Sequence, residues 1–202
     1  MEILSKNLES ALASGTAIKL ELGCGSNPRK GFFTVDQHNM DGVDVVADLN
    51  KPLDLLPDDS CDYLYSRHVL EHIDDVLKLM EEIYRLTRPG GKIEIIVPHF
   101  SNVYAHSDPT HKRFFGLYSM YYFTSGDLQP KNRKVPSFYA SARFRITAIS
   151  IEFYRKSILD RIVSPVFSRL VNHNIATQDF YERRLSPLFH AWQIRYLMEP
   201  DK

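Results

Sequence analysis

The chain has 202 residues, of which 44% are hydrophobic, and it can therefore bury one sizeable core. Its 25 Lys and Arg residues balance its 25 Asp and Glu residues, which gives no electrostatic case for a nucleic-acid partner. Two cysteines make no disulfide framework, and neither a long apolar stretch nor a signal-peptide profile is present, so we expect a cytoplasmic protein without a membrane span.

The first 98 residues alternate apolar segments with polar or helical ones, which is typical of a parallel sheet in an α/β fold. The predicted strands are residues 17–22, 32–36, 43–47, 61–66 and 92–97. Apolar residues at helical spacing predict a helix over 73–88, which a Pro-Gly-Gly turn ends. The connection from Gly23 to Gly31 is too brief for an ordinary crossover, so we expect its helix to be truncated.

The character of the chain changes after residue 98. A stretch rich in His, Tyr, Phe, Asp and Ser predicts a long functional loop, and alternation over 143–154 and 192–197 predicts two further strands. Between them, residues 157–188 are predicted to be helical, with interruptions at Pro165 and Pro187. An apolar stripe over 158–171 favours packing onto the sheet as a cap, with a dimer face or a membrane contact as the alternative.

The most informative stretch is a buried strand that runs into the turn Gly23-Cys24-Gly25, followed by a second strand that ends at Asp36. Glycines at such a turn let the backbone approach a ligand closely, and an acid at the end of the next strand can accept hydrogen bonds from ribose hydroxyls. The glycines could instead serve only a tight turn, and Asp36 could cap a turn or helix. Together, the residues indicate an adenosine-type cofactor site.

Five short motifs in this order resemble those of class I S-adenosylmethionine-dependent methyltransferases. They are Glu21-Leu-Gly-Cys-Gly25, Asp36, Ala47-Asp48-Leu49, the run from Cys61 to His72, and Arg88-Pro-Gly-Gly-Lys92. The resemblance implies an α/β, Rossmann-like sheet that is mostly parallel with an antiparallel C-terminal strand, a shortened first crossover helix and a helical cap inserted near the C-terminus. It implies one domain over 1–202, with a cofactor-binding half at 15–98, a substrate loop region at 99–142, and terminal strands at 143–202 that carry the helical insertion 157–188.

The same resemblance implies S-adenosylmethionine as the cofactor and a role for each matching residue. Glu21 would lie near the amino-acid moiety, Gly23, Cys24 and Gly25 would form the turn, and Asp36 would hold the ribose. Asp48 and Leu49 would face the adenine, and Ser66, Arg67 and His68 would lie near the methionine portion. Asp48 could instead cap a turn with Asn50 and Pro52.

The predicted loop holds the candidate catalytic residues His106, Asp108 and His111. A histidine is the usual base for a hydroxyl proton near neutral pH, and Asp108 could orient the imidazole. The alternative is a solvated loop whose His and Asp side chains cap turns. Glu71 and His72 resemble part of a metal-binding set in some methyltransferases, but similar pairs occur in metal-free ones, and we predict no metal.

The resemblance, taken with these loop residues, implies methyl transfer to an oxygen, less readily a nitrogen, of a small-molecule or saccharide acceptor. The Gly-Cys-Gly-Ser-Asn-Pro loop and the segment from Asp108 to Phe115 resemble a subgroup associated with small molecules and glycans. Two alternatives stay open. One is a non-catalytic partner subunit that binds S-adenosylmethionine, and the other is a nucleic-acid methyltransferase.

Overall fold

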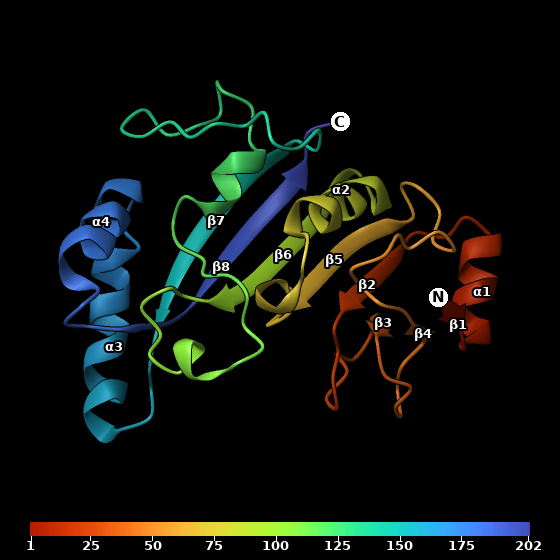
Figure 1. Cartoon of the computed structure of the whole chain (residues 1–202), viewed down its shortest axis with the longest axis horizontal. Coiled ribbons are helices and arrows are strands. Elements are labelled where there is room, and N and C mark those ends of the chain that lie inside the picture. Colours follow the sequence, from red (N-terminus) through yellow and green to blue (C-terminus); the bar gives the residue numbers. More distant parts are fainter.

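The computed structural model describes residues 1–202, with the side chain of Leu159 left aside. Within this described part, eight strands form one sheet in the order β1-β4-β3-β2-β5-β6-β8-β7 (Figure 1). The strands are β1 (Glu2–Ile3), β2 (Ile18–Leu22), β3 (Phe33–Asp36), β4 (Val45–Val46), β5 (Cys61–Arg67), β6 (Thr87–Pro98), β7 (Phe144–Phe153) and β8 (Ala191–Pro200). Strands β2 to β6 run parallel to one another, β1 is antiparallel to β4, and β8 is antiparallel to both β6 and β7. The predicted Rossmann-like sheet with an antiparallel C-terminal strand is confirmed.

The helices lie on one face and at both ends of this sheet (Figure 1). They are α1 (Lys6–Ala13), α2 (Val76–Leu86), α3 (Ile158–Val171) and α4 (Ile175–Phe180), with shorter helical turns at Leu70–His72, Ala105–Ser107, Ser119–Phe123 and Tyr181–Leu185. Helix α2 covers the middle of the sheet, where its Leu79, Met80 and Ile83 join the buried core. No helix among the described residues is long and apolar enough to cross a membrane.

The first crossover was expected to hold a truncated helix, but it holds none. Residues 23–32 form only turns, bends and irregular backbone. Glu21 Oε2 accepts a hydrogen bond from the backbone N–H of Arg29 at 2.6 Å, which folds the loop back onto β2. The Arg29 guanidinium then lies 4.1 Å from the ring centre of Tyr65 and 4.8 Å from that of Phe32. These contacts let ten residues join two parallel strands.

The prediction that Pro165 interrupts the C-terminal helical segment is wrong, since Pro165 lies inside α3. The break comes instead between Asn172 and Asn174. Asn172 Oδ1 accepts from the N–H of Ile151 at 2.7 Å and so ties the end of α3 to β7, while Asn174 begins α4 with a capping box. A single proline costs one backbone hydrogen bond, and here the side-chain caps at the two ends decide where the helices end.

Only part of the apolar stripe on α3 packs inward as predicted. Phe167 and Val171 face the core, whereas four residues spaced four apart are 64–79% exposed. They are Ile158, Ile162, Val166 and Leu170. Leu159, which belongs to the predicted stripe, lies outside the described side chains.

The strand directions bring distant segments to one edge of the sheet. The carboxyl ends of β2, β3, β5 and β6 share this edge, and β8 starts there because it is antiparallel, with Gln193 opposite Pro98. The end of β7 lies beside it, with Glu152 opposite Gln193. This is the edge at which open α/β sheets bind their ligands.

Candidate active site

A cavity of about 790 Å³ lies over the carboxyl ends of the parallel strands. We call it the glycine-turn cavity. Its lining comes from the loops after β2, β3, β4 and β5 and from the segment 109–112. The lining residues are Gly23, Gly25, Asp36, Gln37, His38, Met40, Asp48, Leu49, Asn50, His68, Val69, His72, Ile73, Pro109, Thr110 and Lys112.

The two glycines of the turn are required for different reasons. Both have a positive φ, +68° at Gly23 and +54° at Gly25, which L-residues rarely adopt. A Cβ on Gly23 would come within 2.2 Å of Val69 Cγ2, so the turn packs tightly against the segment after β5. A Cβ on Gly25 would meet no atom within 4 Å, so this glycine leaves open space beside the backbone.

Asp36 holds the glycine turn and faces the cavity at the same time. Its Oδ2 accepts from the N–H of Gly25 at 2.9 Å, and its Oδ1 accepts from the N–H of His38 at 3.0 Å. The side chain is nearly buried. A carboxylate has about four acceptor sites, so two remain for a ligand's hydroxyl groups.

Asp48 plays the turn-capping role that was the alternative for it, and it lines the cavity as well. Its Oδ1 accepts from the backbone N–H of Asn50 at 3.0 Å and from Asn50 Nδ2 at 3.1 Å. These hydrogen bonds lower the pKa of Asp48 below its ordinary value, so it is a carboxylate near neutral pH. Leu49, which is nearly buried beside it, offers an apolar surface.

Four of the residues predicted to bind the cofactor lie outside the lining of this cavity. Glu21 is used to hold the crossover loop, and Arg67 points to solvent. Cys24 is buried in the turn, and burial raises the pKa of its thiol. Ser66 is fully buried, and its hydroxyl has no hydrogen-bond partner among the described residues.

His68 connects the glycine-turn cavity to the other end of the sheet. It follows β5 with a positive φ of +55°, and its Nε2 lies 3.0 Å from Gln193 Oε1 on β8. Gln193 Nε2 donates to Glu152 Oε2 at 2.6 Å, so the amide oxygen must face the imidazole. His68 Nδ1 lies 3.3 Å from Glu71 Oε1 on the other side. Side chains from β7, from β8 and from the segment after β5 thus form one continuous row of polar contacts.

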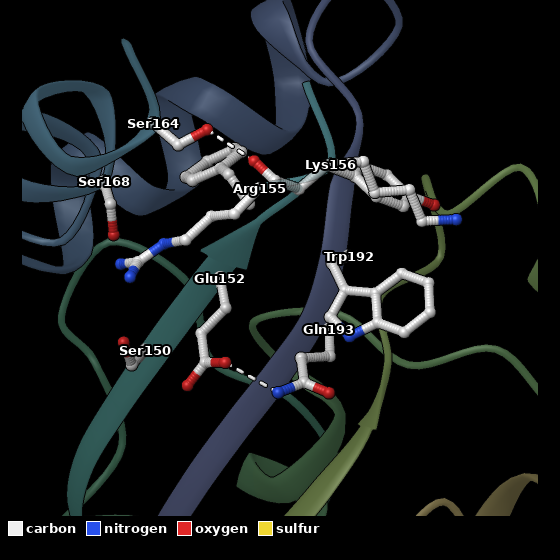
Figure 2. A pocket seen from close by; sticks show the side chains of 10 residues that line it. Ser150, Glu152, Arg155, Lys156, Ser164, Ser168, Trp192 and Gln193 are labelled. Carbon is white, nitrogen blue, oxygen red and sulfur yellow. Dashed lines mark hydrogen bonds between the residues drawn. The ribbon is translucent and has the colours of Figure 1, made fainter. Parts of the chain in front are cut away.

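A second cavity, of about 620 Å³, lies where this row of polar contacts ends, between β7, β8 and α3 (Figure 2). We call it the β7–β8 cavity. Figure 2 shows Glu152 and Gln193 side by side on neighbouring strands, with the Trp192 indole beside them and Arg155 opposite. Ser164 on α3 donates to the carbonyl oxygen of Tyr154 at 2.6 Å. The lining is completed by Ser150, Phe153, Lys156 and Ser168.

Comparison with known proteins assigns the family. A model of the methyltransferase domain family matches residues 3–141 of the chain. The chain belongs to this family. It is therefore a methyltransferase domain, and S-adenosylmethionine is the cofactor that this class of enzyme uses.

Relatives and solved structures agree with this assignment. A curated relative, phosphoethanolamine N-methyltransferase 2 from Caenorhabditis elegans, is 47% identical over 38 residues, which are 19% of this chain and only 9% of that protein. A SAM-dependent methyltransferase from Archaeoglobus fulgidus is 21% identical with a TM-score of 0.52, over 96% of this chain and 91% of that one. A Thermotoga maritima SAM-dependent methyltransferase, described as a possible histamine N-methyltransferase, is 15% identical with a TM-score of 0.52, over 92% and 82%. These two structures share the fold.

The glycine-turn cavity of this methyltransferase suits S-adenosylmethionine. The open space beside Gly25 is a cradle that a Cβ would fill, and it adjoins the free acceptor sites of Asp36. Asp48 and Leu49 supply a carboxylate and an apolar surface farther along the same lining. The donor and acceptor chemistry therefore fits a ribose and an adenine.

None of the loop residues predicted to be catalytic in this methyltransferase lines either cavity. His106 is exposed, stacks on Phe114 with ring centres 4.4 Å apart, and lines neither cavity. Asp108 and His111 lie close together, 3.6 Å between Oδ2 and Nε2. Side-chain and backbone hydrogen bonds from Thr110 lower the pKa of Asp108.

Several lining residues were not identified from the sequence. His38 lies two residues after β3 and Asn50 four residues after β4, so their positions shortly after predicted strands were a usable signal. Gln193 and Glu152 lie within strands and carry no motif, and only the register of β7 on β8 reveals them.

Proposed function

We propose that this methyltransferase moves the methyl group of S-adenosylmethionine, bound in the glycine-turn cavity, to an oxygen of a small polar or saccharide acceptor in the β7–β8 cavity. One observation carries this proposal. His68 lines the first cavity, and its Nε2 contacts Gln193, which lines the second. The two cavities therefore meet at one side-chain contact.

The lining of the β7–β8 cavity supports a hydroxylated acceptor. A carboxylate, an amide, a guanidinium and several hydroxyls converge there beside an indole. Such a set can hydrogen-bond several hydroxyl groups while the aromatic face packs against an apolar face of the acceptor. Saccharides present both kinds of surface.

Glu152 is the residue we assign to the acceptor hydroxyl. Its Oε2 accepts from Gln193 at 2.6 Å, which orients the carboxylate and leaves further lone pairs for a hydroxyl proton. S-Adenosylmethionine, when bound, supplies a methyl group already activated by the sulfonium charge. The chain then has to align the acceptor oxygen with that methyl group and to take its proton, and alignment supplies much of the rate gain.

An amine acceptor is the second candidate, and a specific observation favours it. Lys156 Nζ lies 4.3 Å from the ring centre of Tyr104, 5.8 Å from that of Tyr154 and 5.6 Å from that of Trp192. These rings already hold one ammonium group and could hold that of an acceptor. The similarity over 38 residues to a phosphoethanolamine N-methyltransferase points the same way.

Methyl-transfer assays with labelled S-adenosylmethionine test the proposal, using panels of saccharides, other alcohols and amines. We expect turnover with hydroxylated acceptors, and a loss of at least tenfold in kcat/KM for Glu152→Gln with little change in cofactor affinity. His106→Ala is the informative comparison, because its loop was predicted to supply the base. Turnover that falls in His106→Ala but not in Glu152→Gln would contradict our assignment, and turnover confined to amines would establish the second candidate.

A further inference from the structure

A second cluster of side chains borders the glycine-turn cavity, and neither the cofactor nor the proposed acceptor accounts for it. Glu71 and His72 lie in the short helical turn after β5, and His111 lies in the loop after β6. Each offers one ligand atom, and these three atoms lie within 4.8 Å of one another. Two of these residues are adjacent, and the third comes 39 positions after His72.

Glu71 is a buried carboxylate that lacks the partners such a group needs. It is only 1% exposed, and neither of its carboxylate oxygens accepts a hydrogen bond from any described residue. His68 Nδ1, at 3.3 Å from Oε1, is the nearest group that can carry a positive charge. A buried carboxylate without hydrogen bonds is costly, by several kcal/mol in typical cases, unless a positive charge compensates it.

One nitrogen of each imidazole faces a residue of the segment 108–110, which leaves the other nitrogen to bind a ligand. His72 Nδ1 lies 2.9 Å from Thr110 Oγ1, and this hydroxyl donates to Asp108 Oδ1 at 2.6 Å. Thr110 can therefore only accept from His72, so Nδ1 carries the hydrogen and Nε2 keeps its lone pair.

In His111 the two ring nitrogens exchange roles, and it is Nδ1 that is left to bind a ligand. Its Nε2 faces Asp108 Oδ2 at 3.6 Å, while its Nδ1 is buried with no hydrogen-bond partner among the described residues. One carboxylate, that of Asp108, thus stands behind both imidazoles, directly or through Thr110. Carboxylates placed behind imidazoles in this way fix the ring and the tautomer of histidines that bind metal ions.

We propose that Glu71, His72 and His111 bind a divalent cation of the first transition row, such as Zn²⁺, Mn²⁺ or Co²⁺. Two imidazole nitrogens and one carboxylate suit these ions better than Mg²⁺ or Ca²⁺, which prefer oxygen ligands. Three protein ligands leave at least one coordination position open. His72 and Thr110 also line the glycine-turn cavity, so the ion would lie at its wall.

This assignment changes two expectations drawn from the sequence. No metal was predicted, because the pair Glu71-His72 alone is not specific, and the sequence does not show that the loop returns His111 to it. It also gives His111 and Asp108 a role other than base and orienting acid, because an imidazole nitrogen bound to a cation cannot take a proton. The inference does not rest on the nature of the acceptor.

Titration of the full chain with Co²⁺ and Zn²⁺, without cofactor or acceptor, tests the proposal directly. We expect one ion per chain by calorimetry, a Co²⁺ d–d absorption spectrum, and displacement of Co²⁺ by Zn²⁺. His111→Ala should abolish the one-to-one binding or weaken it at least 100-fold, and Asp108→Asn should weaken it about 10- to 100-fold without removing a ligand. His173→Ala, which changes an exposed histidine far along the chain, should bind the ions like the parent.

Circular dichroism of each variant separates loss of the ion from loss of the fold, and Asp108→Asn serves as the milder change at an exposed position. The proposal is overturned if the folded parent chain binds neither ion stoichiometrically, or if His111→Ala binds them as tightly as His173→Ala does. Methyl transfer is measured separately, so failure here leaves the proposed function standing, and failure of that function leaves this site standing.

Discussion

The glycine-turn cavity and the β7–β8 cavity lie at the same edge of one sheet but are built in different ways. The first is lined largely by loops that follow β2, β3, β4 and β5. Its key contacts join the side chain of Asp36 to the backbone of Gly25, eleven positions away, and of His38, two positions away. The second gathers side chains from β7, α3 and β8, with Glu152 and Gln193 41 positions apart. Local backbone geometry should therefore control the first cavity, and the register of β7 on β8 should control the second.

Substitution of the two turn glycines should give the largest effects and should separate stability from binding. Gly23→Ala forces a Cβ to within 2.2 Å of Val69 Cγ2 at a positive φ, so we expect it to destabilise the fold by about 2–5 kcal/mol. Gly25→Ala keeps only the conformational cost of about 1–2 kcal/mol, but its methyl group enters the cavity. Urea unfolding and calorimetry with S-adenosylmethionine measure the two quantities.

The expected pattern is a stability defect in Gly23→Ala and an affinity defect, beyond any loss of stability, in Gly25→Ala. Equal stability in the two variants would contradict this expectation. It would mean that Val69 can move away from an added methyl group at Gly23 at little cost in free energy.

Asp36→Ala should weaken S-adenosylmethionine about 100-fold, since it removes two charged hydrogen bonds that hold the turn and the acceptor sites offered to the ribose. Calorimetric titration with S-adenosylmethionine and S-adenosylhomocysteine gives the affinities. Asp41→Ala, an exposed acid in the same segment, is the matched control and should bind like the parent. If Asp36→Ala binds within threefold of the parent, the cofactor does not use this carboxylate.

The sequence predicted the sheet and part of the first cavity because the relevant signals are local. A glycine turn after an apolar strand and an acid at the end of the next strand can be recognised without knowing the fold, and Gly23, Gly25, Asp36, Asp48 and Leu49 all line the cavity. Their contacts with the cofactor remain predictions.

Features that depend on tertiary contacts could not be predicted in the same way. Glu21 stands in the expected motif, but its side chain accepts a hydrogen bond from the N–H of Arg29 and does not line the cavity. This hydrogen bond stabilises a crossover loop that has no helix. The side chains of Asn172 and Asn174, rather than Pro165, decide where α3 ends and α4 begins. Glu152 and Gln193 carry no signal at all until β7 and β8 are paired.

Gln193→Ala tests whether the β7–β8 cavity depends on that pairing. We expect kcat/KM for the acceptor to fall about tenfold, because Glu152 and His68 both lose the group that orients them. Cofactor affinity should change less than threefold, since Gln193 does not line the glycine-turn cavity. Gln193→Asn is the conservative comparison, because its shorter side chain cannot span both contacts. A parallel loss of cofactor affinity would show that the cavities are not separable.

The smallest expected effect concerns the charged groups on α2, which are close in sequence. Glu82 on α2 accepts two hydrogen bonds from Arg85 and one, at 2.9 Å, from the N–H of Leu53. The hydrogen bonds from Arg85, with help from Leu53, lower the pKa of Glu82 below its ordinary value. Because its folded pKa lies below the unfolded one, Glu82 stabilises the fold above about pH 4.5, and this contribution is lost as the pH falls through the folded value.

Unfolding free energies measured by urea between pH 3 and pH 7 should therefore fall more steeply with acid in the parent than in Glu82→Gln. At neutral pH the substitution should cost about 1–2 kcal/mol, because it removes the charge from three hydrogen bonds but keeps an acceptor oxygen. Asp54→Asn, an exposed acid in the segment that Glu82 holds, should leave the slope close to that of the parent. If the unfolding free energy of Glu82→Gln falls with acid as steeply as that of the parent, other carboxylates cause the pH dependence. The contacts of Glu82 with Arg85 and Leu53 would then contribute packing rather than charge.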